Sequence, residues 1–379
     1  MKLTDICDFQ GGSQPPKEEW SFDEQEGYIR MLQIRDFTQS ERVTPEYIKI
    51  SNTTKTCEAD DILIARYGAS IGKILTGLAG AYNVAIMRTI PDTSKIKKKY
   101  LYYYLKSPYF QNAILNVGSR AAQAGFNKED LSKLDIICPE LLKQDEIIVV
   151  LEKLEAIIEK RKLELSSLDD LIKARFIELF GDPVIHLDKG ETVKLDTIAD
   201  KITVGFVGEA SNEYVDEGVP YLRTQNVRVN RIDLNGLIYV SEAFHNKNQK
   251  SIIHPGDVVI SRVGVNRGMA AMVPDSLPEA NIANCLIVGK TENINSYYLA
   301  FYMNMSFGKR PQFGASVGSA QGVVNTSILK KWEVYVPDRH MQDEFFEFAK
   351  QVDKSKFAVQ KSLEETHTLF DSLMQQYFG

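Results

Sequence analysis

Two stretches of the chain match each other at an offset of 198 residues: AQAGFNKEDLSKLDIICP at residues 122–139 and AQGVVNTSILKKWEVYVP at residues 320–337. The Ala, Gln, Asn, Leu, Lys and closing Pro positions coincide, and apolar residues fall on apolar residues. A match between such distant segments indicates an internal duplication, so the two stretches occupy corresponding places in two units.

The similarity continues in the same order over the whole chain of 379 residues. KLTDIC (2–7) matches KLDTIA (194–199), and DDILIARYGASIGK (60–73) matches GDVVISRVGVNRGM (256–269). We predict two copies of one unit of roughly 190–200 residues, each large enough for its own core. The match of GYIRMLQIR with PYLRTQNVR pairs Tyr28 with Tyr221, Arg30 with Arg223, Gln33 with Asn226, and Arg35 with Arg228.

The first part of each unit is predicted to be a compact α+β domain. Short apolar runs punctuated by Gly, Pro and Asn predict strands. They are DILIAR (61–66), VAIMRTI (84–90), LDIICP (134–139), DVVISR (257–262) and WEVYV (332–336). KYLYYYLKSPYFQNAIL (99–115) predicts one helical segment. YLYYYL (100–105) matches YLAFYM (298–303) with its aromatic pairing shifted by one residue. The tyrosines recur at helical spacing beside leucines, so we interpret them as core residues rather than base-stacking residues.

The second part of each unit is predicted to be one long helix. Residues 140–180 contain neither Gly nor Pro. Apolar residues recur at alternating spacings of four and three, which is typical of a coiled-coil seam, although Arg161 and Arg175 interrupt it. The predicted pairing residues are Ile147, Leu151, Leu154, Ile158, Leu165, Leu168, Ile172 and Leu179 in the first helix, and Phe345, Val352, Val359, Leu363, Phe370 and Leu373 in the second.

Each apolar seam needs a partner, because an isolated amphipathic helix leaves its stripe in water. We predict that the two helices pair with each other as an antiparallel coiled coil; pairing with another molecule is the alternative. The predicted organisation is a first domain at 1–140, a first helix at 141–181, a second domain at 182–338 and a second helix at 339–379. The fold class is α+β with two repeated globular domains.

Sequence motifs of catalysis are not found. GASIGK (68–73) has three residues between its glycines, whereas a phosphate loop needs four, and Ile74 stands where Ser or Thr would bind Mg²⁺. The four cysteines are scattered, and all five histidines lie in the second half, so we predict neither a metal site nor catalytic residues. With no long apolar run and no apolar signal core at the N-terminus, a cytoplasmic protein is expected.

Recognition chemistry recurs instead in both units. Arginine can hydrogen-bond guanine, and Asn or Gln can pair with adenine. The loops GSRAAQAGFN (118–127) and GASVGSAQGVVN (314–325) allow close backbone approach. The alternative is that these residues form surface ion pairs and turns. The candidate DNA-binding residues are Arg30, Gln33, Arg35, Arg66, Tyr67, Lys73, Arg120, Gln123 and Asn127, and Arg223, Gln225, Asn226, Arg228, Arg262, Asn266, Arg267, Gln321 and Asn325.

In three features the chain resembles the specificity subunit of type I restriction–modification systems. These are ILIARYGASIG with its copy VVISRVGVNRG, the Gln…Asn loop followed by a Gln-Asp-Glu helix start (144–146 and 342–344), and the tandem of recognition domain and long helix. The resemblance implies a non-enzymatic subunit in which each domain reads one half of a split double-stranded DNA target. Because the units diverge most at residues 8–28 and 200–220, the half-sites are expected to differ.

The resemblance also implies partners. Two methyltransferase subunits and two motor–nuclease subunits would dock on this chain, with S-adenosylmethionine bound by the methyltransferases and no cofactor bound by this chain. No membrane partner is expected. Self-association of the isolated chain stays open, as do two rival functions: a coiled-coil scaffold without DNA recognition, and an enzyme with an unrecognised site.

Overall fold

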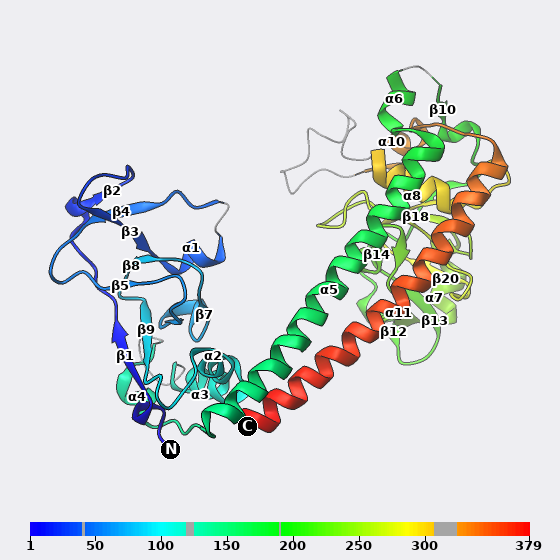
Figure 1. The fold of residues 1–379 in the computed structure, drawn as a ribbon. Coiled ribbons are helices and arrows are strands. Elements are labelled where there is room, and N and C mark those ends of the chain that lie inside the picture. Colours follow the sequence, from blue (N-terminus) through cyan, green and yellow to red (C-terminus); the bar gives the residue numbers. More distant parts are fainter. Residues whose placement is uncertain (40–41, 119–124, 189–190, 307–323) are drawn as a thin grey trace. The chain divides into compact units, whose positions relative to one another are not determined.

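The computed structural model describes residues 1–39, 42–118, 125–188, 191–306 and 324–379 (Figure 1). The chain forms two compact units, Met1–Glu164 with Val359–Gly379, and Leu165–Ala358. Each unit therefore holds one globular domain and a segment of each long helix. No helix in the described ranges has the length and apolarity that a membrane span requires.

The first domain contains two sheets that share one core. One has the strand order β1-β9-β6-β7 and is antiparallel throughout, and the other has the order β2-β4-β3-β8-β5 with β3 and β8 parallel. The run DILIAR is apolar without alternation because its strand lies centrally and is buried on both faces. The strands are β1 Cys7–Gly11, β2 Trp20–Ser21, β3 Tyr28–Leu32, β4 Glu46–Lys49, β5 Thr56–Cys57, β6 Leu63–Ala65, β7 Ile74–Leu75, β8 Gly80–Tyr82 and β9 Ile86–Pro91.

The helices of the first domain are α1 Ile34–Thr38, α2 Lys98–Lys106, α3 Pro108–Gly118 and α4 Lys128–Ser132. The helical segment predicted over 99–115 is confirmed, but it divides at Ser107 into α2 and α3. Ser107 is extended (ψ 150°), as expected for a residue before proline, and Pro108 suits the first position of a new helix.

Three tyrosines of α2, Tyr100, Tyr103 and Tyr104, are buried in the core, which confirms their predicted role. The Tyr100 hydroxyl donates to the carbonyl of Ile137, and the Tyr104 hydroxyl donates to the carbonyl of Asp135, each at 2.9 Å. These two bonds anchor the segment LDIICP to α2. Against the N-terminus this segment forms only the isolated bridge Lys2–Asp135, so the strand predicted there is wrong.

The second domain repeats the two sheets in the same strand order, β11-β21-β18-β19 and β12-β16-β13-β20-β17. The duplication inferred from sequence is therefore also a duplication of topology. The pair of β10 with β22 extends the bridge that Lys2 and Asp135 form in the first domain, and the pair of β14 with β15 is added. The strands are β10 Val193–Lys194, β11 Ile202–Val204, β12 Tyr214–Val215, β13 Val219–Leu222, β14 Val227–Arg228, β15 Arg231–Ile232, β16 Ile238–Val240, β17 Ile252–Ile253, β18 Val258–Ser261, β19 Ala270–Met272, β20 Ala280–Ile282, β21 Cys285–Val288 and β22 Glu333–Val334.

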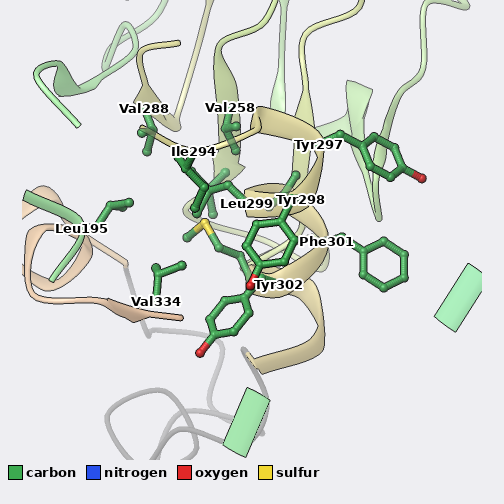
Figure 2. Close-up of a cluster of buried hydrophobic side chains, with 14 of the residues drawn as sticks. Leu195, Val258, Val288, Ile294, Tyr297, Tyr298, Leu299, Phe301, Tyr302 and Val334 are labelled. Atoms are coloured by element: carbon green, nitrogen blue, oxygen red, sulfur yellow. The ribbon is translucent and has the colours of Figure 1, made fainter. Parts of the chain in front are cut away.

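The helix α8 (Ser296–Ser306) lies in the core of the second domain, with Leu299 near the aliphatic residues Val258 and Ile294 (Figure 2). Phe301 points to the opposite side, where its ring lies 5.0 Å from that of Phe176 on the first long helix. The Tyr298 hydroxyl donates to the carbonyl of Tyr335 at 2.8 Å, as Tyr100 does in the first domain. The two aromatic segments thus align without the one-residue shift expected from sequence. The helices are α6 Pro183–Asp188, α7 Glu242–Lys247, α8 Ser296–Ser306 and α10 Thr326–Lys330.

One part of the sequence alignment between the units is wrong by three residues. In the parallel strand pairs, Leu32 lies opposite Tyr82 and Leu222 lies opposite Ile282. A turn follows the first strand of each of these pairs. In both domains the first residue of that turn donates its backbone N–H to the side chain three residues later. Gln33 donates to Asp36 in the first domain and Arg223 donates to Asn226 in the second, both at 2.9 Å. The counterpart of Arg223 is therefore Gln33 and not Arg30.

The two long helices are α5 Leu141–Phe180 and α11 Arg339–Phe378. In the first unit, the beginning of α5 packs with the end of α11, because Ile147 and Leu151 share one core cluster with Met374 and Phe378. In the second unit, the end of α5 packs with the beginning of α11, since the rings of Phe176 and Phe345 are 5.3 Å apart. The helices therefore pair as an antiparallel coiled coil, as predicted.

The seam between the helices combines apolar and charged contacts. Of the fourteen predicted pairing residues, seven are buried and seven half-buried. Charged residues also pair across the seam of the second unit: Arg175, one of the two interruptions, pairs with Glu344 at 2.6 Å, and Lys356 pairs with Asp169 at 2.5 Å. The heptad pattern missed Phe176, which is fully buried against the second domain.

A buried glutamine joins each long helix to its domain. The side chain of Gln144 accepts from the Lys97 backbone N–H at 2.9 Å and donates to the Pro139 carbonyl at 2.8 Å. Gln342 makes the same two bonds, with the Asn295 N–H and the Pro337 carbonyl, both at 2.8 Å. The repeated Gln-Asp-Glu helix start thus has a structural role at the joint between domain and helix.

Candidate nucleic-acid interface

Two polar turns lie at one edge of the first domain. The strand turn (residues 33–38) follows β3, and the hairpin turn (residues 66–73) joins β6 to β7. The residues after β8 connect them: the Asn83 N–H donates to the Leu32 carbonyl at 3.2 Å, and the Arg66 N–H donates to the Ala85 carbonyl at 2.8 Å. The candidate residues of the two turns therefore belong to one surface region.

The strand turn is organised by two carboxylates. Asp36 is buried, accepts the Gln33 N–H and forms an ion pair with Arg30 at 2.9 Å. Glu46 on β4 accepts a hydrogen bond from the Gln33 side chain at 2.6 Å and forms an ion pair with Arg35. Arg30 is thus engaged in holding the turn, whereas Gln33 and Arg35 share one carboxylate at its outer face.

The hairpin turn depends on two glycines with positive φ, Gly68 at 69° and Gly72 at 81°, a conformation that side chains disfavour. Arg66 lies over the Tyr67 ring, with its guanidinium carbon 5.0 Å from the ring centroid, and its Nε donates to the Phe126 carbonyl at 3.2 Å. Lys73 is exposed at the end of the turn.

The loop between α3 and α4 contributes one described candidate. The Asn127 side chain caps α4 by accepting the Asp130 N–H at 3.0 Å, and in the second domain Asn325 caps α10 in the same way through Ile328 at 2.9 Å. Both carbonyl oxygens are therefore used within the domain. Arg120, Gln123 and Gln321 lie outside the described residues.

In the second domain the strand turn (residues 223–228) and the hairpin turn (residues 262–269) touch directly. Asn266 of the hairpin turn is buried, and its amide donates to the carbonyls of Thr224 at 3.1 Å and Val227 at 3.2 Å. Asn226 is also buried and donates to the Asp233 carbonyl at 3.0 Å. These two asparagines stabilise the turns by hydrogen bonds to backbone carbonyls.

The remaining candidates of the second domain are more accessible. Gln225 is exposed, while Arg223, Arg228, Arg262 and Arg267 are half-buried. Arg228 lies 3.8 Å from the Asp233 carboxylate. The Nε atoms of Arg223 and Arg262 are buried and have no hydrogen-bond partner among the described residues. Both guanidinium groups therefore keep at least one buried donor that no described residue satisfies.

Sequence reasoning missed the aromatic residues that border the first strand turn. Trp20 and Phe22 line an open pocket of about 470 Å³ together with Gln33, Arg35 and Glu46. The signal was present as WSF at residues 20–22, an aromatic pair in the segment that differs most between the units. Its connection to the turn depends on the pairing of β2 with β4, which the sequence does not indicate.

This surface consists mainly of hydrogen-bonding groups beside aromatic rings. Guanidinium, amide and aromatic groups gather at the turns. Within the described ranges, no three His, Cys, Asp or Glu side chains are grouped so that they could hold a metal ion. Together with the paired helices, these features describe a chain with two domains of the same topology, each with polar turns at the corresponding edge.

Comparison with known proteins identifies the family. Residues 1–166 and 188–366 match the model of the type I restriction modification DNA specificity domain, so the chain belongs to this family. It is 21% identical over 349 residues to the type I restriction enzyme MjaVIII specificity subunit of Methanocaldococcus jannaschii, covering 87% of this chain and 80% of the relative.

Solved structures show the same fold. The S subunit of a type I restriction–modification system from M. genitalium aligns with a TM-score of 0.56 at 16% identity, covering 100% of this chain and 95% of that chain. A chain from a structure that addresses complex assembly and conformational transition of the type I R-M system aligns with a TM-score of 0.57 at 14% identity, covering 100% and 96%.

Proposed function

We propose that this chain is the DNA sequence-specificity subunit of a type I restriction–modification complex and reads a bipartite, asymmetric target with one domain per half-site. One observation carries the proposal: both domains place the same two turns at the same edge but equip them with different side chains. Gln33 and Arg35 stand in the first strand turn where Arg223 and Gln225 stand in the second. The same frame with different donors suits two different half-sites.

The helices would set the separation of the two half-sites. Each has 40 residues, or about 60 Å at about 1.5 Å per residue. Half-sites on one face of DNA lie about 34–36 Å apart per helical turn, which a spacer of this length can accommodate.

The same helices would also dock partners, two methyltransferase and two motor–nuclease subunits. Apolar side chains on their outer faces support this role, because exposed apolar groups gain from burial in an interface. They are Leu142, Val149, Leu163, Phe357 and Leu369. S-adenosylmethionine would bind to the methyltransferases, and this chain would bind no cofactor and have no catalytic role.

The test is long-read sequencing of methylated adenines in cells that carry the complete system, with and without this chain. We expect a two-part, non-palindromic motif that requires the chain. Methylation that is independent of the chain would refute the proposal. A complex that assembles without contacting DNA in methylation-protection mapping would favour the scaffold, and activity of the chain alone would favour an enzyme.

A further inference from the structure

With the corrected register, each strand turn carries one glutamine and one arginine at the same two positions, and their order is reversed between the domains. Position one of the turn is Gln33 in the first domain and Arg223 in the second, as the matching backbone bonds to Asp36 and Asn226 require. Position three is then Arg35 in the first domain and Gln225 in the second. In both domains position one is half-buried and position three is exposed.

An aromatic side chain occupies the equivalent place beside each turn. Trp20 lies opposite Ile48, and Tyr214 lies opposite Val240. Ile48 and Val240 are themselves equivalent, because they face Ile29 and Val219 of the central strands. Each strand turn thus has one glutamine and one arginine, and the edge strand of the same sheet carries an aromatic residue at the equivalent position.

In the first domain these groups form a pocket that is open to solvent. The Trp20 indole N–H donates to the Pro15 carbonyl at 3.2 Å, which fixes the ring. Glu46 holds both the Gln33 amide and the Arg35 guanidinium at the rim. The Arg35 guanidinium is half exposed, and exposed ion pairs contribute only about 0–1 kcal/mol to stability. Arg35 can therefore exchange Glu46 for another acceptor at little cost.

In the second domain the carboxylate is missing. Ile238 faces Tyr221 where Glu46 faces Met31, so an apolar residue replaces Glu46. The Nε of Arg223 is buried without a hydrogen-bond partner among the described residues. An unpaired buried donor is costly, and an acceptor supplied by a ligand would remove that cost.

We propose that these residues are base-reading pairs at equivalent positions, with their order reversed between the domains. Arginine suits the O6 and N7 acceptors of guanine, and glutamine suits the N6 and N7 edge of adenine. Position one therefore reads adenine in the first half-site and guanine in the second, and position three reads the reverse. The inference rests on the proposed function and adds the class of base read by each position.

The experiment exchanges the pair in the first domain, Gln33→Arg with Arg35→Gln, in the complete complex, and determines the methylated motif by long-read sequencing. We expect adenine and guanine preferences to exchange at two positions of one half-site while the other half-site is unchanged. Lys49→Gln, which removes an exposed charge from β4 outside the pocket, is the matched control and should leave the motif unchanged.

Binding competition supplies a second readout that does not need methylation. With Arg35→Ala, the complex should lose about 5- to 150-fold discrimination at one guanine of one half-site, since a bidentate base contact contributes about 1–3 kcal/mol. If the exchange variant abolishes methylation, this loss at a single base still supports the inference, whereas uniform loss over all positions overturns it.

Two failures are distinguishable. A wild-type motif that persists unchanged in the exchange variant overturns the base-reading pair and leaves the proposed function intact. If wild-type cells yield no motif that depends on the chain, the proposed function itself fails. A changed preference in both half-sites would also overturn the assignment of Gln33 and Arg35 to a single half-site.

Discussion

Replacing Phe378 with Ala, at the end of the chain, should destabilise the first globular domain. Phe378 is only 3% exposed, and its ring lies 5.0 Å from that of Tyr100 and 6.4 Å from that of Tyr104. Truncating a buried Phe to Ala costs about 3–5 kcal/mol through lost burial and the cavity left behind. That is a large fraction of the about 5–15 kcal/mol by which a domain is stable.

The equivalent residue of the first repeat provides the converse variant. Phe180 is 4% exposed and packs in the second domain, with ring centroids 4.8 Å from Tyr298 and 5.7 Å from Phe345. Phe180→Ala should therefore destabilise the second domain by a similar amount. Phe357, on α11 and 73% exposed, is the matched control, and its replacement by Ala should change stability by no more than about 0.5 kcal/mol.

Hydrogen exchange followed by mass spectrometry of the full chain distinguishes the domains. In Phe378→Ala the protected amides of α2 should exchange at least about 100-fold faster, while those of α8 keep their rates. In Phe180→Ala the pattern should be reversed. Acceleration in α8 alone for Phe378→Ala would refute the assignment of each helix end to the other repeat's domain.

Three further outcomes are expected. A fragment of residues 1–181 should form a homodimer by light scattering, because each copy's helix end can fill the place that α11 leaves empty in the other; a stable monomer would contradict this. Gln144→Ala and Gln342→Ala should each lower the free energy of unfolding by about 1–3 kcal/mol in urea titrations, because a buried N–H loses its acceptor; an unchanged midpoint would argue against the joint. Burial raises the pKa of Tyr82 and of Tyr221 to about 12. The stability that they contribute is complete below the unfolded pKa of about 10 and falls as pH rises toward 12, which urea midpoints at alkaline pH can check.

Local sequence patterns predicted the helices and strands of this protein better than the contacts between them. Apolar residues at spacings of four and three indicated both long helices, since a helix periodicity needs only neighbouring residues. The division at Ser107 was missed because helical spacing continues across it, although Pro108 marked the boundary. The strand predicted at LDIICP was apolar enough, but the segment pairs with the N-terminus through the single bridge Lys2–Asp135.

The candidate interface was predicted by residue type and not by position. The shared Tyr-x-Arg letters aligned Arg30 with Arg223, but backbone pairing in the sheets makes Gln33 the counterpart. Asn226 and Asn266 are amides of the expected kind, yet they are buried and hold the turns. Trp20 joins the site only through the pairing of its strand with β4.

The sequence by itself determined the duplication, the two kinds of segment in each unit and the apolar seams, because each of these follows from repetition or short-range periodicity. Only the tertiary structure decided that Phe180 and Phe378 complete the core of the other repeat's domain. It also decided which residues share a position at the two turns. Both depend on contacts between residues far apart in the chain, and a one-dimensional pattern carries no information on which distant surface buries a side chain.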